Sequence, residues 1–501
     1  MTPLFYISCS LSTLLILAAF IAGLKGKEKL RICLIFFGAF SFYLGAAFLD
    51  DFVNIWDERF HALVAKNSMK NPLKPGLYAN PVLGDFTVAW DATAVWLHKQ
   101  PLFTWLMALS YKAFGVNYWA GRLPAALLMS LVCSFGYSVM VDLLNKRTAF
   151  LGALLMVYSY YSMSLVSGRQ FIDQNDAQFV GFASLAFFMA LRFIQKQKRA
   201  WLLSSAILTS CAILTKWLPG LYAFGFLCLV WVMGRPFKFT DLVRYFAVVV
   251  ALVLPWQIFA YRKYPNHFMH ELKLNSAHFT DAVEGQVRDW DFHFLQFPNH
   301  YGFAILFLML FGIIHSFVKR NRMAMAVSVL VVFVYGFFTL AQTRMPSFTY
   351  VAMSGVVFLS TYSLHALLAL KYRIKAMRAL VGLFFILTIY ENFHYDELIK
   401  NFDRNGQQSY YRNGLVENKE WFKRQNLTDK DVVFNLPRRT HVELMFYTDA
   451  AAYPYWPSKK DLEKVKAAGV NLYIFKRLSQ PLPDELPENA KVLNGDLKCF
   501  E

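Results

Sequence analysis

Charge is scarce in this 501-residue chain, in which Asp, Glu, Lys and Arg together make up only 17% of the residues. A typical soluble domain carries about 25%. Hydrophobic residues account for 56% of the chain, so a lipid bilayer is the expected solvent and a soluble fold is a poor second choice. Apolar runs of about 20 residues, the length that crosses the hydrocarbon core as a helix, recur along most of the first 393 positions.

Cysteine is rare as well, and no CxxC pair occurs among the six residues. Five of them fall inside apolar runs, which excludes a disulfide framework or a cysteine zinc site. The formal charge of +18 does not indicate nucleic acid, because residues 395–501 hold 17 basic against 16 acidic side chains. The basic excess therefore flanks membrane helices, and no basic stripe with interleaved aromatic residues marks a nucleic-acid partner.

The loop charges predict the topology of an all-α polytopic membrane protein with about twelve transmembrane helices. Lys and Arg gather in alternate loops, which the positive-inside rule makes cytoplasmic, so both termini are expected outside. We expect a membrane module over residues 1–394, with long external loops at 51–120 and 262–301. The run Leu102–Phe114 is too short to span and carries Lys112, which predicts a helix in the membrane interface. The predicted spans are 4–24, 31–50, 121–142, 148–166, 177–194, 200–216, 218–233, 242–261, 302–318, 323–341, 348–370 and 376–393.

Residues 395–501 have the composition of a small soluble α/β domain, expected on the extracytoplasmic side. Apolar stretches at Asp431–Leu436 and Val470–Phe475 predict strands, and Lys459–Ala468 between them predicts a helix. Ser458 followed by Asp461 is a capping-box pattern, and Gly469 suits the position after the helix end. We expect this domain to cover the mouth of any reactive site on that side of the membrane.

Asp57 and Glu58 follow directly after an expected span, which places two carboxylates at the external water boundary. A carboxylate at that height could take the proton of a lipid-linked or soluble hydroxyl and so make it a nucleophile. The competing interpretation is a solvated helix end, or an ion pair with Arg59. Lys99, just before the interfacial run, could hold a phosphate, or it could simply extend toward lipid headgroups.

Asp173 and Asp176 lie one helical turn apart at another external helix end, with Arg169 near enough to offset their charge. A role for Asp176 in capping the helix is an equal alternative. Lys216 and Arg344 each stand alone at an external boundary beside a proline. Two such cations would suit a phosphate or pyrophosphate group, although interfacial anchoring explains either one singly.

Histidine is concentrated in the loop 262–301, which holds five of the eleven in the chain. His267, His270 and His278 could form a metal site with His98. A bound divalent metal is therefore one possible cofactor, and the sequence indicates no other. Ordinary loop histidines are the simpler interpretation, because the spacing matches no metal motif.

The order of these motifs resembles the GT-C glycosyltransferases of the protein O-mannosyltransferase and lipid A aminoarabinose transferase type. The resemblance covers most of residues 31–394. Trp217 stands where glycine is common in the family, and His98 and Gln100 replace its usual acidic residue and first proline. The matching segments are Asp57-Glu58, His98-Lys99-Gln100-Pro101-Leu102, Gly121-Arg122-Leu123-Pro124, Asp176-Ala177, Thr215-Lys216-Trp217-Leu218-Pro219-Gly220 and Arg344-Met345-Pro346.

The resemblance implies a polyprenyl-phosphate sugar donor reached from the bilayer, a lipid, glycan or protein acceptor, and a bacterial inner membrane with the site on its periplasmic face. Asp57 would be the catalytic base, supported by Glu58 and Asp176. Lys99, Lys216, Arg344 and Arg169 would bind the donor phosphate, with Asp173 and Arg122 as supporting residues. Because phosphate is a good leaving group, the reaction demands no general acid, and the implied mechanism is a single in-line displacement with inversion.

Other classes of protein fit parts of the pattern. A secondary transporter would have similar helices, but it would place ionisable residues near the midplane, often in two related halves. A ligase that uses a polyprenyl diphosphate is separated only weakly by the sequence. A membrane anchor for the C-terminal domain gives no reason for Asp57-Glu58 or for the lone external cations.

Overall fold

The computed structural model describes residues 3–83, 87–169, 173–234, 236–370, 375–392, 407–437, 439–477, 486–487 and 489–498. The boundary expected at 394/395 lies outside the described residues. The chain forms two compact units. The first unit contains residues 1–49, 123–263 and 271–396, and the second contains 50–122, 264–270 and 397–501.

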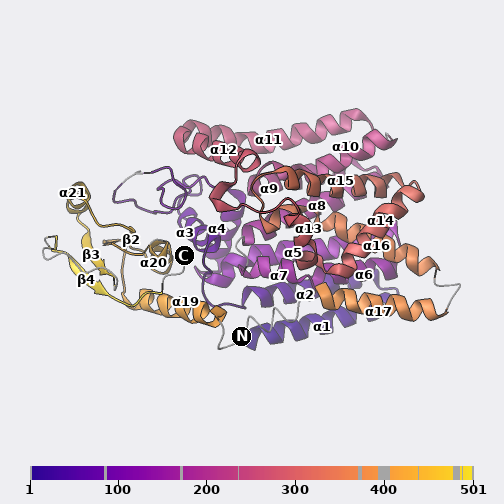
Figure 1. Ribbon diagram of the computed structural model, residues 1–501, viewed down its shortest axis with the longest axis horizontal. Coiled ribbons are helices and arrows are strands. Elements are labelled where there is room, and N and C mark those ends of the chain that lie inside the picture. Colours follow the sequence, from indigo (N-terminus) through magenta and orange to yellow (C-terminus); the bar gives the residue numbers. More distant parts are fainter. Residues whose placement is uncertain are drawn as a thin grey trace. The chain divides into compact units, whose positions relative to one another are not determined.

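The first unit is a bundle of long helices (Figure 1). Its elements, some continuing into the second unit, are α1 (Pro3–Leu24), α2 (Glu28–Ala47), α5 (Tyr118–Leu143), α6 (Lys146–Val157), α7 (Tyr160–Ser167), α8 (Gln174–Lys196), α9 (Arg199–Lys216), the 3-10 helix η1 (Leu218–Leu221), α10 (Tyr222–Gly234), α11 (Phe239–Lys263), α12 (Pro265–Thr280), η2 (Val283–Gly285), α13 (Phe292–Tyr301), α14 (Phe303–Val318), α15 (Arg322–Leu340), η3 (Pro346–Ala352), α16 (Met353–Leu370) and α17 (Lys375–Asn392). A helix lies at each of the twelve positions expected to span.

Within the described residues, eight helices are long and apolar enough to cross a membrane, or nine if the bent pair α13 and α14 is one span. Nine of the twelve expected positions in the described residues therefore meet this criterion of length and composition, when the bent pair is counted as one span. The stretches at Leu218–Gly234 and Gly382–Glu391 are apolar but shorter. Outward-facing Leu14, Leu252 and Phe307 are exposed, which suits lipid and would be unfavourable in water. The chain is an integral membrane protein.

Helix α8 occupies the interior of the first unit. Its residues are buried along most of its length, and the buried set includes Asn175, Asp176 and Gln178. Polar groups inside a membrane bundle are costly unless they are paired, and they mark sites more often than they mark packing. The first turn of α8 therefore identifies one part of the candidate site.

The second unit combines the first long loop with the C-terminal segment. Its elements are α3 (Asp57–Ser68), α4 (Leu102–Phe114), α19 (Gln407–Arg424), β1 (Asp431–Phe434), α20 (Thr440–Tyr447), β2 (Ala451–Ala452), α21 (Lys459–Ala468), β3 (Asn471–Lys476) and β4 (Lys491–Asn494). The helix at Leu102–Phe114 has the bounds that the sequence predicts.

A four-stranded sheet organises the C-terminal segment, with all neighbours parallel in the order β2-β1-β3-β4. Strand β1 is buried along its whole length and pairs Val433 with Tyr473 of β3. A continuous apolar run is what a parallel strand covered on both faces requires. The capping box of Ser458 and Asp461 opens α21, and Gly469 ends it with φ of 64°. The predicted strand, helix and strand are confirmed.

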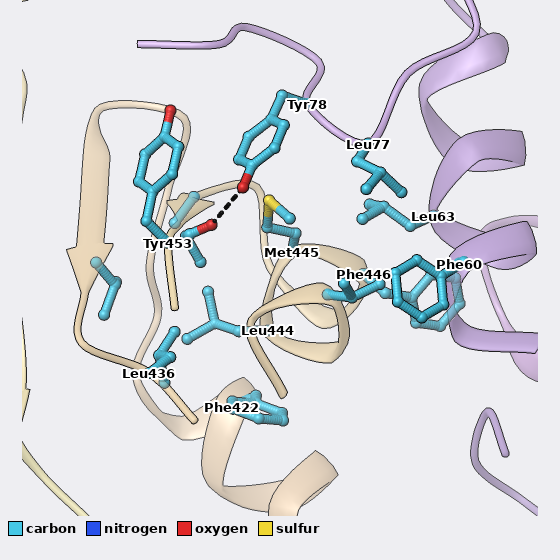
Figure 2. Close-up of a cluster of buried hydrophobic side chains, with 14 of the residues drawn as sticks. Phe60, Leu63, Leu77, Tyr78, Phe422, Leu436, Leu444, Met445, Phe446 and Tyr453 are labelled. Atoms are coloured by element: carbon cyan, nitrogen blue, oxygen red, sulfur yellow. Dashed lines mark hydrogen bonds between the residues drawn. The ribbon is translucent and has the colours of Figure 1, made fainter. Parts of the chain in front are cut away.

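One hydrophobic core joins the first loop to the C-terminal segment. Phe60 and Leu63 of α3 pack with Phe446 of α20, and Tyr78 stacks on Tyr453 with ring centroids 5.0 Å apart (Figure 2). The Tyr78 hydroxyl donates to the backbone oxygen of Ala452 at 3.0 Å. Burial of aromatic side chains on this scale is the main stabilising contribution to a small unit. The C-terminal segment therefore folds onto the loop that begins α3.

Candidate active site

Helix α3 presents Asp57 and Glu58 in its first turn, where the helix dipole favours negative charge. The residue before it, Trp56, has φ of 67°, an uncommon backbone for a residue with a bulky side chain. Asp57 and Glu58 are successive residues of a helix with 3.6 residues per turn, so their carboxylates point in different directions. Their surroundings differ accordingly.

The carboxylate of Glu58 is buried and fully engaged. Its Oε1 accepts from Arg122 Nε at 2.8 Å, and its Oε2 accepts from Arg122 Nη2 at 3.1 Å and from the Asn54 backbone N–H at 2.6 Å. Arg122 also donates to the backbone oxygens of Asp50 and Phe52, each at 2.8 Å. This bidentate pair fixes the turn between α2 and α3. Glu58 and Arg122 are positioning residues in this geometry.

The carboxylate of Asp57 is 21% exposed, and its Oδ2 lies 4.0 Å from Nζ of Lys99, which is equally exposed. Lys99 also contacts Nε2 of His98 at 3.0 Å, and the His98 ring stacks on Trp90. Arg59, the alternative partner for these carboxylates, pairs instead with Glu443 at 2.7 Å. Asp57 is the accessible carboxylate of the pair, with a cation beside it.

The C-terminal segment holds α3 at both ends. Arg59 near its beginning forms the buried pair with Glu443, and burial raises the pKa of Glu443 while it lowers the pKa of Arg59. Lys66 in its last turn donates to the backbone oxygens of Met445 at 3.0 Å and Phe446 at 3.2 Å. Burial lowers the pKa of Lys66. Asp57 is thus set on a helix with little freedom to move. The sequence gives no signal for these pairings, since their partners are almost 400 positions apart.

Asp176 and Lys216 come together in the first unit, where Asp176 Oδ1 accepts a hydrogen bond from Lys216 Nζ. Asp176 is completely buried, and within the described residues its Oδ2 has no hydrogen-bond partner. Asn175 Nδ2 donates to the backbone oxygen of Thr215 at 3.0 Å and ties α8 to the end of α9. The cap of α8 is Asp173, which accepts from the Asn175 backbone, so Asp176 does not serve that role.

The segment after α15 packs against the same lysine. Nζ of Lys216 lies 5.3 Å from the ring centroid of Phe348 in η3. Arg344, two residues before η3, donates to the backbone oxygen of Arg288 at 2.6 Å and to that of Thr339 at 3.0 Å. Arg344 therefore fixes the loop before η3 through backbone carbonyls. Arg169 is half-buried at the end of α7, and its role as a phosphate ligand stays a prediction.

The backbone at Trp217 is one that glycine adopts most readily. Trp217 has φ of 64° and ψ of −157°, a backbone region that is essentially confined to glycine. Trp56 and Trp217 both have positive φ, and each adjoins a predicted site residue. Backbone strain that the surrounding structure maintains is concentrated at functional sites in proteins.

Replacing Trp217 isolates the backbone strain from the side chain. Ala and Gly both remove the indole, but only Gly relieves the strained backbone, which costs about 1–3 kcal/mol in an L-residue. We expect Trp217→Gly to be more stable than Trp217→Ala, by about 1 kcal/mol after the higher chain entropy of glycine is subtracted. Thermal unfolding of the purified full chain in detergent measures the difference. Equal or lower stability of the Gly variant would contradict the strain.

The histidines predicted as weak metal candidates do not assemble into a site within the described part of the chain. No group of three or more His, Cys, Asp or Glu side chains that could hold a metal ion occurs there. His98 stacks on Trp90, and the His278 ring meets Phe348 edge to face. His267 is buried in α12. The aromatic contacts give His98 and His278 a packing role.

The fold defines the class of protein. A bundle of membrane helices whose first long loop carries the short helices α3 and α4 is the GT-C architecture that the sequence resemblance implied. The structure is similar to that of ArnT from Cupriavidus metallidurans in the apo state, with a TM-score of 0.60 and 13% identity, over 87% of this chain and 84% of that chain. It is also similar to ArnT from the same organism bound to undecaprenyl phosphate, with a TM-score of 0.56 and 14% identity, over 89% of this chain and 88% of that chain.

A protein-family model and one relative match parts of the sequence. The model described as dolichyl-phosphate-mannose-protein mannosyltransferase matches residues 98–259. Those residues include Lys99, Arg122, Asp176 and Lys216. An uncharacterized protein of Aquifex aeolicus is 23% identical over 322 residues, which is 62% of this chain and 60% of the relative. The matched region thus spans less than two thirds of that relative's length.

Proposed function

We propose that the chain is a membrane glycosyltransferase that moves a sugar from a polyprenyl-phosphate donor to a hydroxyl group of a lipid, glycan or protein. The observation that carries the proposal is the contrast at the start of α3. Glu58 is buried and paired, whereas Asp57 is accessible and lies 4.0 Å from Lys99. Known proteins support the donor class, since the matching family model is described as a dolichyl-phosphate-mannose-protein mannosyltransferase and one similar ArnT structure holds undecaprenyl phosphate.

In the proposed reaction, Asp57 takes the proton of the acceptor hydroxyl, and the hydroxyl oxygen attacks the anomeric carbon of the sugar at the same time. The bond from that carbon to the phosphate oxygen breaks, and the electron pair leaves on polyprenyl phosphate. Lys99 stabilises negative charge that develops on the phosphate. Because phosphate leaves as a stable anion, the step needs no general acid, and one displacement inverts the anomeric centre. Lys216, Arg344 and Arg169 remain proposed donor contacts, and Asp173 and Asp176 remain proposed supports.

We place the chain in a bacterial inner membrane, with the second unit on the periplasmic side. The basic loops between the membrane helices support this orientation through the positive-inside rule. The rule predicts the side of the membrane on which the loop 51–120 emerges. This prediction is independent of the proposed transfer reaction.

The role of Lys99 is tested by Lys99→Gln, which keeps the length of the side chain close to that of lysine and removes the charge. We expect the KM for a polyprenyl-phosphate sugar donor to rise about tenfold or more, because a charge-assisted phosphate contact contributes roughly 1.5–3 kcal/mol. Steady-state transfer in membranes measures it, with Lys112→Gln on the exposed end of α4 as the matched control. An unchanged KM in Lys99→Gln would remove Lys99 from the donor site.

A further inference from the structure

Arg439 of the C-terminal segment contacts the residue that precedes Asp57. Its guanidinium carbon lies 5.1 Å from the centroid of the Trp56 ring, in a cation–π arrangement. Both residues have φ of 67°. Two residues with uncommon backbones therefore meet face to face at the beginning of α3. No local pattern predicts this contact, because 383 positions separate the two residues.

The basic side chains around this contact differ in whether a carboxylate pairs with them. Lys99 is paired with Asp57, Arg59 with Glu443, and Arg122 with Glu58. Arg59 lies within electrostatic range of both Asp57 and Arg439. For Arg439 itself, the described part of the chain offers no carboxylate partner, and its buried Nε has no hydrogen-bond partner there. A guanidinium held rigidly with unused donors is suited to an anion with oxygen acceptors.

We propose that Arg439 binds an anionic group, a phosphate or a carboxylate, of the acceptor whose hydroxyl Asp57 deprotonates. The inference rests on the proposed function and deepens it, because it assigns the acceptor to an anionic class. Trp56 connects Arg439 with Asp57, because its ring stacks against the Arg439 guanidinium and it precedes Asp57 in the chain. A strained backbone persists only where the surrounding structure maintains it, so the positive φ at both residues indicates that their backbones are constrained.

The strain also separates a binding role from a structural one. Glycine adopts positive φ without cost, so Arg439→Gly removes the cation and relieves the backbone at the same time. If Arg439 serves stability, Arg439→Gly and Arg439→Gln should both lower the melting temperature. If it serves binding, Arg439→Gly should melt at the wild-type temperature or above and should bind anions weakly. Lys491→Gln is the control, because Lys491 also lies over an aromatic ring, at 5.6 Å from Tyr473.

The test uses decyl phosphate, a single-chain phosphomonoester, with the purified full chain in a neutral detergent. Lys99→Gln serves as the background, so that a proposed donor contact is already weakened. In that background we expect Arg439→Gln and Arg439→Gly to weaken binding about tenfold, and Lys491→Gln to leave it unchanged. Unchanged binding in both Arg439 variants would overturn the proposal, and so would a fall in melting temperature that accounts for the loss.

A second probe distinguishes an acceptor group from the surrounding lipid. Dioctanoyl phosphatidylglycerol carries the phosphodiester of a bulk anionic lipid, and we expect it to bind more weakly than decyl phosphate and without dependence on Arg439. Equal binding that is lost in Arg439→Gly would assign the site to lipid headgroups and overturn the acceptor assignment. If the wild type binds decyl phosphate through Arg439 but transfers no sugar, the proposed function fails while the anion site stands.

Discussion

Asp57→Asn is expected to lower the rate of sugar transfer by about 10²–10⁴-fold, the range that a general base contributes. The amide keeps the shape of the side chain but cannot accept the proton of the acceptor hydroxyl. Donor binding should change little, since no donor contact is assigned to Asp57. Rates are measured in membranes at matched expression, with donor affinity determined separately.

The neighbouring carboxylate supplies the comparison. Glu58 has the same charge one residue away, but it is saturated by Arg122 and by the Asn54 backbone. A fall in transfer in Glu58→Gln should therefore follow the amount of folded protein. Asp57→Asn should instead remain folded and lose only turnover. Full activity in Asp57→Asn would remove the assigned base.

Breaking the buried pair should have the largest effect on stability. Arg122→Met leaves the Glu58 carboxylate uncompensated in the interior, which costs about 3–5 kcal/mol. It also removes the donors to the backbone oxygens of Asp50 and Phe52, at a cost of about 1–3 kcal/mol for each unsatisfied group. We expect the variant to express poorly or to melt far below the wild type.

A double variant tests whether the charge is the cause. Arg122→Met with Glu58→Gln removes both charges, so it should be less damaging than Arg122→Met alone. Lys498→Met, which breaks the more exposed pair with Asp496, should change stability by about 1 kcal/mol at most. Equal melting temperatures for Arg122→Met and the wild type would contradict the structural role of the pair.

The sequence predicted features that depend on local pattern. Apolar runs located a helix at each of twelve positions, and the short run with Lys112 predicted α4 with its observed bounds. The capping box of Ser458 and the apolar strands β1 and β3 were also recognised. Two-residue β2 and half-exposed β4 were missed, because neither is long enough to show a period of two.

Pairings across the chain lay beyond sequence reasoning. An ion pair of Arg59 with the nearby carboxylates was the alternative interpretation, yet the partner of Arg59 is Glu443. Lys66 caps the end of α20, and Arg439 stacks on Trp56. These contacts also change how the C-terminal domain should be tested. Deletion of residues 400–501 would remove the support of α3 along with any surface that selects the acceptor, so point variants such as Arg439→Gly are cleaner.

The central claim is that the chain transfers sugar from a polyprenyl-phosphate donor with Asp57 as the base. The most direct measurement is the release of polyprenyl phosphate from a donor labelled in its sugar, in a single turnover by the purified full chain supplied with native lipid extract. We predict that the wild type moves the label to an acceptor and releases polyprenyl phosphate, and that Asp57→Asn binds the donor but releases none. Movement of the donor across the membrane without cleavage, or equal release by both proteins, would contradict the account.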